Sequence, residues 1–161
     1  MAVTSQLCLW IKFPKASNCK RLIFYLDPDT RPDFPDEVPE AEAKWVGIFE
    51  LLPDPCSIEQ IDEHTVSVYF DDEADAEAHQ ICAAIALLEP DNILSWESIE
   101  GEVYYKSWQG GDNTLIYAPE GLEDPMDDKK YNRVLNEETR KHLDELHGTP
   151  DEALRFLSEI L

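Results

Sequence analysis

Basic residues are scarce in this chain. Lysine and arginine total 13 residues against 35 aspartates and glutamates, which gives a formal net charge of −22 over 161 residues. A field of this sign repels nucleic acid and anionic lipid and attracts basic proteins, within the roughly 8 Å over which charges act at physiological salt. The scarcity of positive charge therefore argues against a direct nucleic-acid or membrane ligand and favours a basic protein as partner.

Cysteine is also sparse, and its spacing lacks the common metal and redox motifs. Cys8, Cys19, Cys56 and Cys82 are far apart and form no C-x-x-C pair. The N-terminus lacks the basic start, apolar stretch and cleavage site of a secretory signal, and no apolar run approaches the length of a membrane span. We therefore expect reduced thiols in a cytoplasmic protein.

The acids that are present are concentrated in the middle of the chain. Residues 1–26 contain no acid and carry +4, residues 27–102 carry −20, and residues 103–161 carry −6. Residues 27–40 form an acidic segment with four prolines, which neither a helix nor a central strand accommodates, so we expect an exposed loop. Residues 119–130 predict a second acidic loop.

The central stretch predicts a strand, an acidic corner and a buried helix. Residues 65–70 alternate between apolar and polar side chains, as in a half-buried strand. Apolar residues then recur at helical spacing before Pro90 ends the helix, at Ala74, Ala78, Ile81, Ile85 and Leu88. Between the strand and this stripe the chain has five acids: Asp71, Asp72, Glu73, Asp75 and Glu77.

The N-terminal third predicts further strands. Residues 7–13 alternate, and residues 21–26 follow as a second strand that can pair with the first in a hairpin. Residues 41–52 fit either a helix or a strand. We favour a strand over 45–51, because aromatic and β-branched residues dominate it and Gly47 is unfavourable inside a helix. Residues 57–60 predict either one helical turn or a short strand paired with 65–70.

The C-terminal half predicts a meander followed by two helices. Residues 93–99 and 102–108 flank Glu100–Gly101, and residues 114–118 supply a third strand. One helix is predicted over residues 136–147 with Leu135, Leu143 and Leu146 inward. A second helix begins after Thr149, an N-cap residue, with Leu154, Leu157, Ile160 and Leu161 as its apolar stripe.

These elements predict a single α+β domain over residues 1–161. It would have a mainly antiparallel sheet of about five to seven strands, one central helix packed on it and a C-terminal helical pair over 136–161. A domain of this length buries about two-thirds of the surface of its unfolded chain, so it needs no metal or disulfide to fold.

No motif predicts a metal, a cofactor or a nucleophile. His142 and His147 are five residues apart, so they diverge around a helix instead of sharing one face as a zinc pair does. The D-x-D opening of the 27–40 loop resembles a calcium loop only at its start, because Arg31, Pro32 and Val38 replace an oxygen ligand, a glycine and a glutamate. We predict no cofactor and no catalytic residues.

The acids at residues 71–77 exceed what a helix N-terminus uses, since one or two carboxylates satisfy its N–H groups and dipole. Self-repelling acids are more useful as a surface that steers a partner. Exposed aromatic rings on the meander would add contacts for that partner. The predicted partner-binding residues are Asp33, Asp36, Glu37, Glu40, Asp71, Asp72, Glu73, Asp75, Glu77, Tyr104 and Trp108.

The function favoured by these patterns is that of a non-catalytic acidic binding protein. It would block or neutralise a basic surface on a nuclease or nucleic-acid-binding protein, as immunity proteins and nucleic-acid mimics do. Two alternatives stay open: a small metal-dependent or carboxylate-based enzyme, whose acids and histidines would converge in one cleft, and an acidic adaptor domain without inhibitory role.

Overall fold

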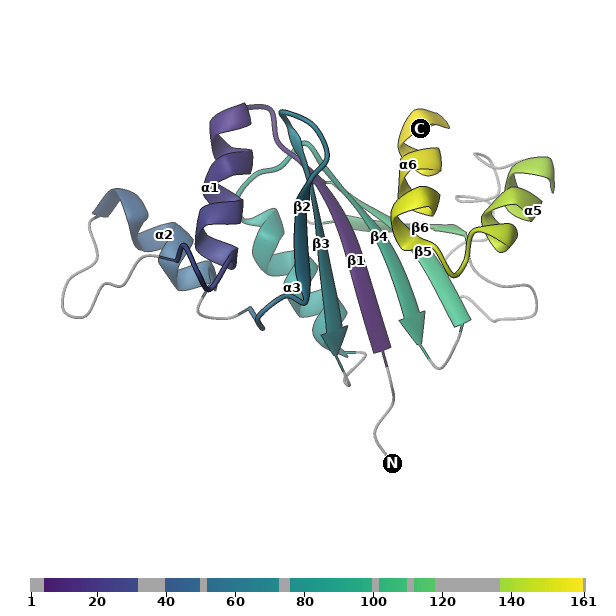
Figure 1. Cartoon of the computed structure of the whole chain (residues 1–161), viewed down its shortest axis with the longest axis horizontal. Helices are drawn as coiled ribbons and strands as arrows, with labels where there is room; N and C mark the ends of the chain where they lie inside the picture. The colour runs from purple at the N-terminus through teal and green to yellow at the C-terminus, as the bar shows by residue number, and fades with distance from the viewer. Residues whose placement is uncertain are drawn as a thin grey trace.

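The structure is a computed structural model that describes residues 5–31, 40–49, 52–72, 76–99, 102–109, 112–117 and 137–160. Within these ranges it contains six strands and five helices, so the α+β class is as predicted (Figure 1). In chain order they are β1 (Ser5–Lys12), α1 (Ala16–Leu26), α2 (Glu40–Phe49), β2 (Ser57–Gln60), β3 (Thr65–Asp72), α3 (Ala76–Ala86), β4 (Asn92–Ile99), β5 (Glu102–Gln109), β6 (Asp112–Tyr117), α5 (Glu137–Glu145) and α6 (Pro150–Ile160).

The strands form one antiparallel sheet in the order β2-β3-β1-β4-β5-β6. β1 lies between β3 and β4 in the sheet. α3 connects β3 to β4 and so passes over β1, while α1 and α2 connect β1 to the β2–β3 hairpin. This order and these connections are those of the split β-α-β, or ferredoxin-like, motif, extended beyond β4 by β5 and β6. Such a motif fixes an architecture and carries no function by itself.

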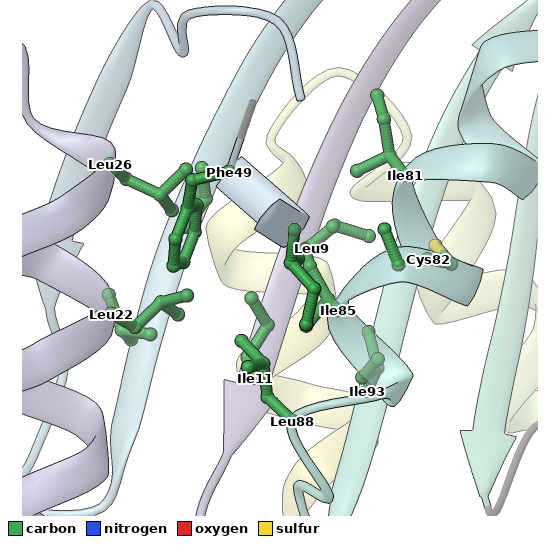
Figure 2. Packing of buried hydrophobic residues seen from close by; sticks show 14 of the residues in the cluster. Leu9, Ile11, Leu22, Leu26, Phe49, Ile81, Cys82, Ile85, Leu88 and Ile93 are labelled. Atoms are coloured by element: carbon green, nitrogen blue, oxygen red, sulfur yellow. The ribbon is translucent and has the colours of Figure 1, made fainter. Parts of the chain in front are cut away.

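One face of the sheet packs against α1, α2 and α3. Alternation along β1 points Leu7, Leu9 and Ile11 to this face. Figure 2 shows Leu9 and Ile11 among the buried side chains of the helices. The α3 stripe is confirmed where the structure describes its side chains: Ile81 and Ile85 are buried, and so is Leu88 just beyond the helix. The predicted stripe residue Ala74 lies outside the described residues, and Ala78 is described for its backbone only. The cluster comprises residues from four strands and three helices, so it joins segments that are far apart in the chain.

Two strand predictions on this face were wrong. Residues 21–26 belong to α1, whose buried residues Cys19, Leu22, Tyr25 and Leu26 follow a helical period that begins before residue 21. Residues 45–49 belong to α2. The two helices pack through aromatic rings, with Tyr25 stacked on Phe49 at 5.4 Å between centroids, and this contact outweighs the strand propensity of the aromatic residues.

Arg31 connects the end of α1 to the segment between α2 and β2. Its guanidinium donates to the carbonyls of Tyr25 and Leu26 at 2.8 and 3.0 Å and to Asp54 Oδ1 at 3.0 Å. A cation at a helix C-terminus satisfies carbonyls that have no partner within the helix. Residue 31, at the start of the predicted acidic loop, therefore has a structural role that sequence patterns did not indicate.

The opposite face of the sheet is covered by α5 and α6. Cys8, Trp10 and Trp96 point to this side and pack with Leu154 and Leu157 of α6. The Trp96 indole N–H donates to the His147 carbonyl at 3.0 Å, in the turn between the two helices. Both helices were predicted, but Ile160 is 43% exposed, so the stripe of α6 ends one turn earlier than expected.

The remaining strand predictions are confirmed. Residues 57–60, for which two alternatives stood, form β2 and pair with β3. β4, β5 and β6 form the predicted meander, with Ile99 opposite Glu102 in the pairing of β4 and β5. The predicted turn residues 100 and 101 lie outside the described residues. β1 pairs with β3 and β4 and not with residues 21–26, because those residues are helical.

Candidate functional site

The predicted partner-binding acids lie in several parts of the molecule. Glu40, at the start of α2, and Asp71, near the end of β3, are exposed. Asp72 lies in β3 and Glu77 in the first turn of α3, both described for their backbone only. The other predicted acids lie outside the described residues: Asp33, Asp36, Glu37, Glu73 and Asp75.

β3 extends further into the acidic corner than predicted. It continues through Asp72, which pairs with Ser5, while Asp71 pairs with Gln6. Because side chains alternate between faces along a strand and Tyr69 packs on the side of α5 and α6, Asp71 belongs to that same face. These two acids therefore do not share a helix N-terminus, which corrects the prediction that the strand ends at Phe70.

The two aromatic residues predicted at the interface differ in exposure. Tyr104 is half-buried, and its hydroxyl lies 3.5 Å from Glu102 Oε2. Burial, followed by the charge of Glu102, raises the pKa of Tyr104. Trp108 is only 4% exposed and belongs to the core under α3, so its prediction as a contact residue was wrong. Its position on β5 points it inward, next to Ile93 on β4.

Sequence reasoning missed a set of acids at one end of the sheet. We call them the sheet-end acids: Asp62, Glu63, Glu89 and Asp91. All four are exposed. They lie at the end of the sheet farthest from the marked N-terminus (Figure 1), in the β2–β3 turn and in the loop from α3 to β4.

Backbone hydrogen bonds hold these two loops against the end of β1. The Phe13 N–H donates to the His64 carbonyl at 2.8 Å, and the Asp91 N–H donates to the Lys12 carbonyl at 2.7 Å. The His64 ring lies 3.0 Å from the Phe13 carbonyl through Nδ1. The loops consequently flank the same short segment, and their carboxylates share one side of the molecule.

Two of the sheet-end acids have a constrained local geometry. The carboxylate of Asp62 accepts the His64 N–H at 2.8 Å. Burial acts to raise the pKa of Asp62, but hydrogen bonds from His64 and Thr65 outweigh it and hold the pKa below its usual value. Glu89 has a φ of 58°. That left-handed conformation costs a residue with a side chain about 1–2 kcal/mol relative to right-handed backbone.

The sheet-end acids have no ion pair with any residue in the described ranges. Lys12 is the basic residue at the end of β1 and is itself exposed. Across these ranges, exposed aspartates and glutamates outnumber exposed lysines and arginines by more than two to one. The excess negative charge therefore faces solvent, where it is accessible to a partner.

A buried ion pair lies beneath α3, on the face of the sheet that α1, α2 and α3 cover. Glu97 is 5% exposed, and its Oε1 is 3.7 Å from Lys106 Nζ on the neighbouring strand. Burial, and then the charge of Glu97, raises the pKa of the nearby Cys82 thiol well above its usual value. A thiol that stays protonated is a poor nucleophile and metal ligand, so this group stabilises the interior and does not suit catalysis.

A second polar group fixes α6 to the sheet. Asp151 Oδ1 accepts from Ser67 Oγ at 2.6 Å, from Trp10 Nε1 at 2.9 Å and from Cys8 Sγ at 3.5 Å. Burial acts to raise the pKa of Asp151, but these donors and Arg155 outweigh it and lower the pKa. Burial and the Asp151 charge raise the pKa of Cys8 to about 12. The arrangement keeps the thiol protonated.

A hollow of about 530 Å³ lies between α5 and α6. His142 packs edge-on against Phe156 at 4.5 Å, and its Nδ1 is 3.7 Å from Glu145 Oε2. Glu138 and Lys141 also line the hollow, so its lining combines acidic, basic and apolar side chains. This mixed lining selects no single class of ligand as clearly as the sheet end does.

Within the described ranges, no three histidine, cysteine, aspartate or glutamate side chains are grouped closely enough to hold a metal ion. No helix in those ranges has both the length and the apolar character needed to cross a bilayer. Comparisons with protein-family models, with curated proteins and with solved structures find no match to this chain.

Two signals in the sequence could have located the groups that were missed. The hairpin turn at residues 100–101 sets the register of β4 and β5, which places Glu97 diagonally across from Lys106. Similarly, pairing residues 57–60 with 65–70 puts Asp62 and Glu63 in a turn, where acids are exposed. The approach of Glu89 and Asp91 to that turn depends on tertiary contacts with β1, which no local pattern encodes.

Proposed function

We propose that this protein is a non-catalytic acidic binding protein that associates with the basic surface of a partner protein and blocks or neutralises it. The observation that carries the proposal is the set of exposed sheet-end acids, which form no ion pair with any residue that the structure describes. Like charges at short range repel, so they cost stability in the isolated molecule and gain a favourable interaction when a cationic surface approaches.

The buried polar groups support the same proposal. Glu97 is buried and paired with Lys106, and the exposed Asp151 accepts three donors from the sheet, so both carboxylates stabilise the fold. The carboxylates that remain accessible are on the surface and in turns. Exposed carboxylates steer association and set its salt dependence more than they determine affinity, which suits an inhibitor that must find its target rapidly.

The proposed partner is a basic protein inside the cell, such as a nuclease or another nucleic-acid-binding protein. Its cationic surface would ordinarily contact phosphate groups, and carboxylates arranged at the sheet end would compete for the same lysines and arginines. An inhibitor of this class needs no cofactor and no bound metal.

The experiment compares two variants of equal charge. One replaces the sheet-end acids (Asp62→Asn, Glu63→Gln, Glu89→Gln, Asp91→Asn), and the control replaces four exposed acids of α5 and α6 (Glu137→Gln, Glu138→Gln, Glu152→Gln, Glu159→Gln). Immobilised wild-type and variant proteins are used to capture basic proteins at low and high salt. We expect the sheet-end variant to lose capture that the control retains.

Equal capture by all three proteins would contradict a localised binding surface. Recovery of acidic proteins only, or of none, would contradict the proposed function as a whole. Circular dichroism and thermal unfolding of both variants establish that any loss of binding does not reflect loss of the fold.

A further inference from the structure

β2 is an edge strand. It is the first strand in the sheet order and pairs with β3 on one side (Figure 1). On its other side, no backbone hydrogen bond reaches it from another residue of the described ranges. Natural proteins usually cover or block such an edge, because its backbone groups can pair with another chain.

The register shows which backbone groups face the open side. The Ile61 N–H donates to the Thr65 carbonyl at 2.9 Å, so residue 61 bonds inward to β3. In an antiparallel pair, inward-bonding residues alternate with residues whose N–H and C=O point away. Ile58 and Gln60 consequently present their backbone groups to the open edge, while Ser57 and Glu59 face β3.

The side chains of β2 differ between the two faces of the sheet. Ile58 is half-buried and packs against the core beneath α1, α2 and α3. Glu59 is exposed on the opposite face, next to Ser67 in the register. A strand added to this edge would therefore meet an apolar neighbour on one face and a carboxylate on the other.

The turn that follows β2 adds negative charge at one end of the edge. Asp62 and Glu63 are exposed there and have no ion pair within the described ranges. At the other end, Asp54 is paired with Arg31 at 3.0 Å. The excess negative charge along the β2 edge therefore lies at the β2–β3 turn.

We propose that β2 accepts an extended segment of the basic partner as a seventh strand. The segment would alternate basic and apolar residues, with its basic side chains next to Glu59 and its apolar ones next to Ile58. This inference rests on the proposed function, because it identifies where and how that partner docks. Backbone pairing of this kind supplies affinity, and the alternating side chains supply specificity.

Charge argues for a basic segment and against a second copy of this chain. Antiparallel pairing of β2 with β2 of another copy would place Glu59 near its own equivalent. Like charges on paired strands are destabilising. A segment carrying lysine or arginine reverses the sign of these interactions.

The experiment uses three blocked peptides as probes of the wild-type protein. The first alternates lysine and valine, the second alternates glutamate and valine, and the third is an alanine-rich helical peptide with the same positive charge as the first. Affinity is measured by calorimetry, and amide hydrogen exchange is followed by NMR. We expect the first peptide to bind most tightly and to slow exchange at Ile58 and Gln60 at least about tenfold, as new strand pairing does.

A substitution then removes one outward donor. Gln60→Pro deletes an N–H that faces the open edge, a position where a strand tolerates proline. We expect it to weaken binding of the lysine–valine peptide about tenfold or more, whereas Gln60→Ala, which equally loses the side-chain hydrogen bond to the Asp62 carbonyl, should stay within about twofold. If the proline variant does not fold, a lysine–valine peptide N-methylated on alternate residues tests the same pairing against wild-type protein.

The outcomes separate this inference from the proposed function. Equal binding of both basic peptides, with unchanged exchange at Ile58 and Gln60, would overturn strand addition and leave an acidic binding surface. Binding of neither basic peptide would overturn both. Concentration-dependent protection of the same two amides without peptide would assign the edge to a second copy and would likewise overturn the inference.

Discussion

At the scale of single residues, Asp151 connects α6 to two strands. It accepts from three buried donors on β1 and β3, Cys8, Trp10 and Ser67. Asp151→Ala leaves those donors without their acceptor, so we expect the free energy of unfolding to fall by about 1–3 kcal/mol. Chemical denaturation measures it. Glu152→Ala, at the exposed neighbouring position, is the control and should change stability by less than about 0.5 kcal/mol.

The same carboxylate predicts a pH dependence of stability. The pKa of Asp151 is lower in the folded protein than its ordinary value, so the unfolded chain binds more protons. Its contribution is therefore complete above about pH 4, the ordinary aspartate range, and is lost as pH falls through the folded pKa. Denaturation between neutral and acidic pH should show a steeper loss for wild type than for Asp151→Ala. Parallel curves would contradict this assignment.

Glu89 predicts a second residue-scale effect through its φ of 58°. Glycine adopts this conformation without strain, whereas a β-branched side chain resists it. We expect Glu89→Gly to be more stable than Glu89→Val by about 1–2 kcal/mol in thermal or chemical unfolding. A valine variant as stable as the glycine variant would show that the loop relaxes to ordinary backbone.

At the scale of secondary-structure elements, α3 supports the core between β3 and β4. Ile81 is 3% exposed and lies on the stripe that faces the sheet (Figure 2). Ile81→Ala should lower the free energy of unfolding by about 2–5 kcal/mol, because it leaves a cavity that the sheet cannot fill. Ala83→Ser, on the exposed side of the same helix, is the matched control. A negligible loss in the alanine variant would mean that the helix faces are assigned incorrectly.

Element type was predictable wherever a single period dominated the sequence. Residues 65–70 alternate and form β3, and the apolar spacing of residues 81–88 matches the buried side of α3. α1 and α2 were not predicted because β-branched and aromatic residues favour strands locally. Their helical state depends on rings that meet between elements, such as Tyr25 and Phe49. That contact involves residues 24 positions apart, which local propensity does not represent.

The candidate site was only partly predictable for a similar reason. The sequence correctly indicated a large excess of acids between residues 27 and 102. It did not indicate that β3 extends through Asp72, so that both Asp71 and Asp72 belong to the strand. Nor did it indicate that the two loops that carry the sheet-end acids both bond to the end of β1. The functional role of the acids at residues 71–77 stays a prediction.

At the scale of the whole molecule, the carboxylates that bond to the interior lie apart from the sheet-end acids. Glu97 and Asp151 have their partners inside, under the helices that cover the two faces of the sheet. The sheet-end acids and Glu59 lie where the sheet ends and where its β2 edge is open. A basic partner could engage both features at once, since the β2–β3 turn joins them.

The central claim concerns electrostatic association at this side of the molecule, and the most direct test is an association rate. Stopped-flow fluorescence measures the rate for the lysine–valine peptide with wild type, with the sheet-end variant and with the α5–α6 control variant, at low and at high salt. We predict a rate that falls with salt and that drops several-fold in the sheet-end variant but less than about twofold in the equally charged control. Equal rates for the two variants at low salt would contradict the account.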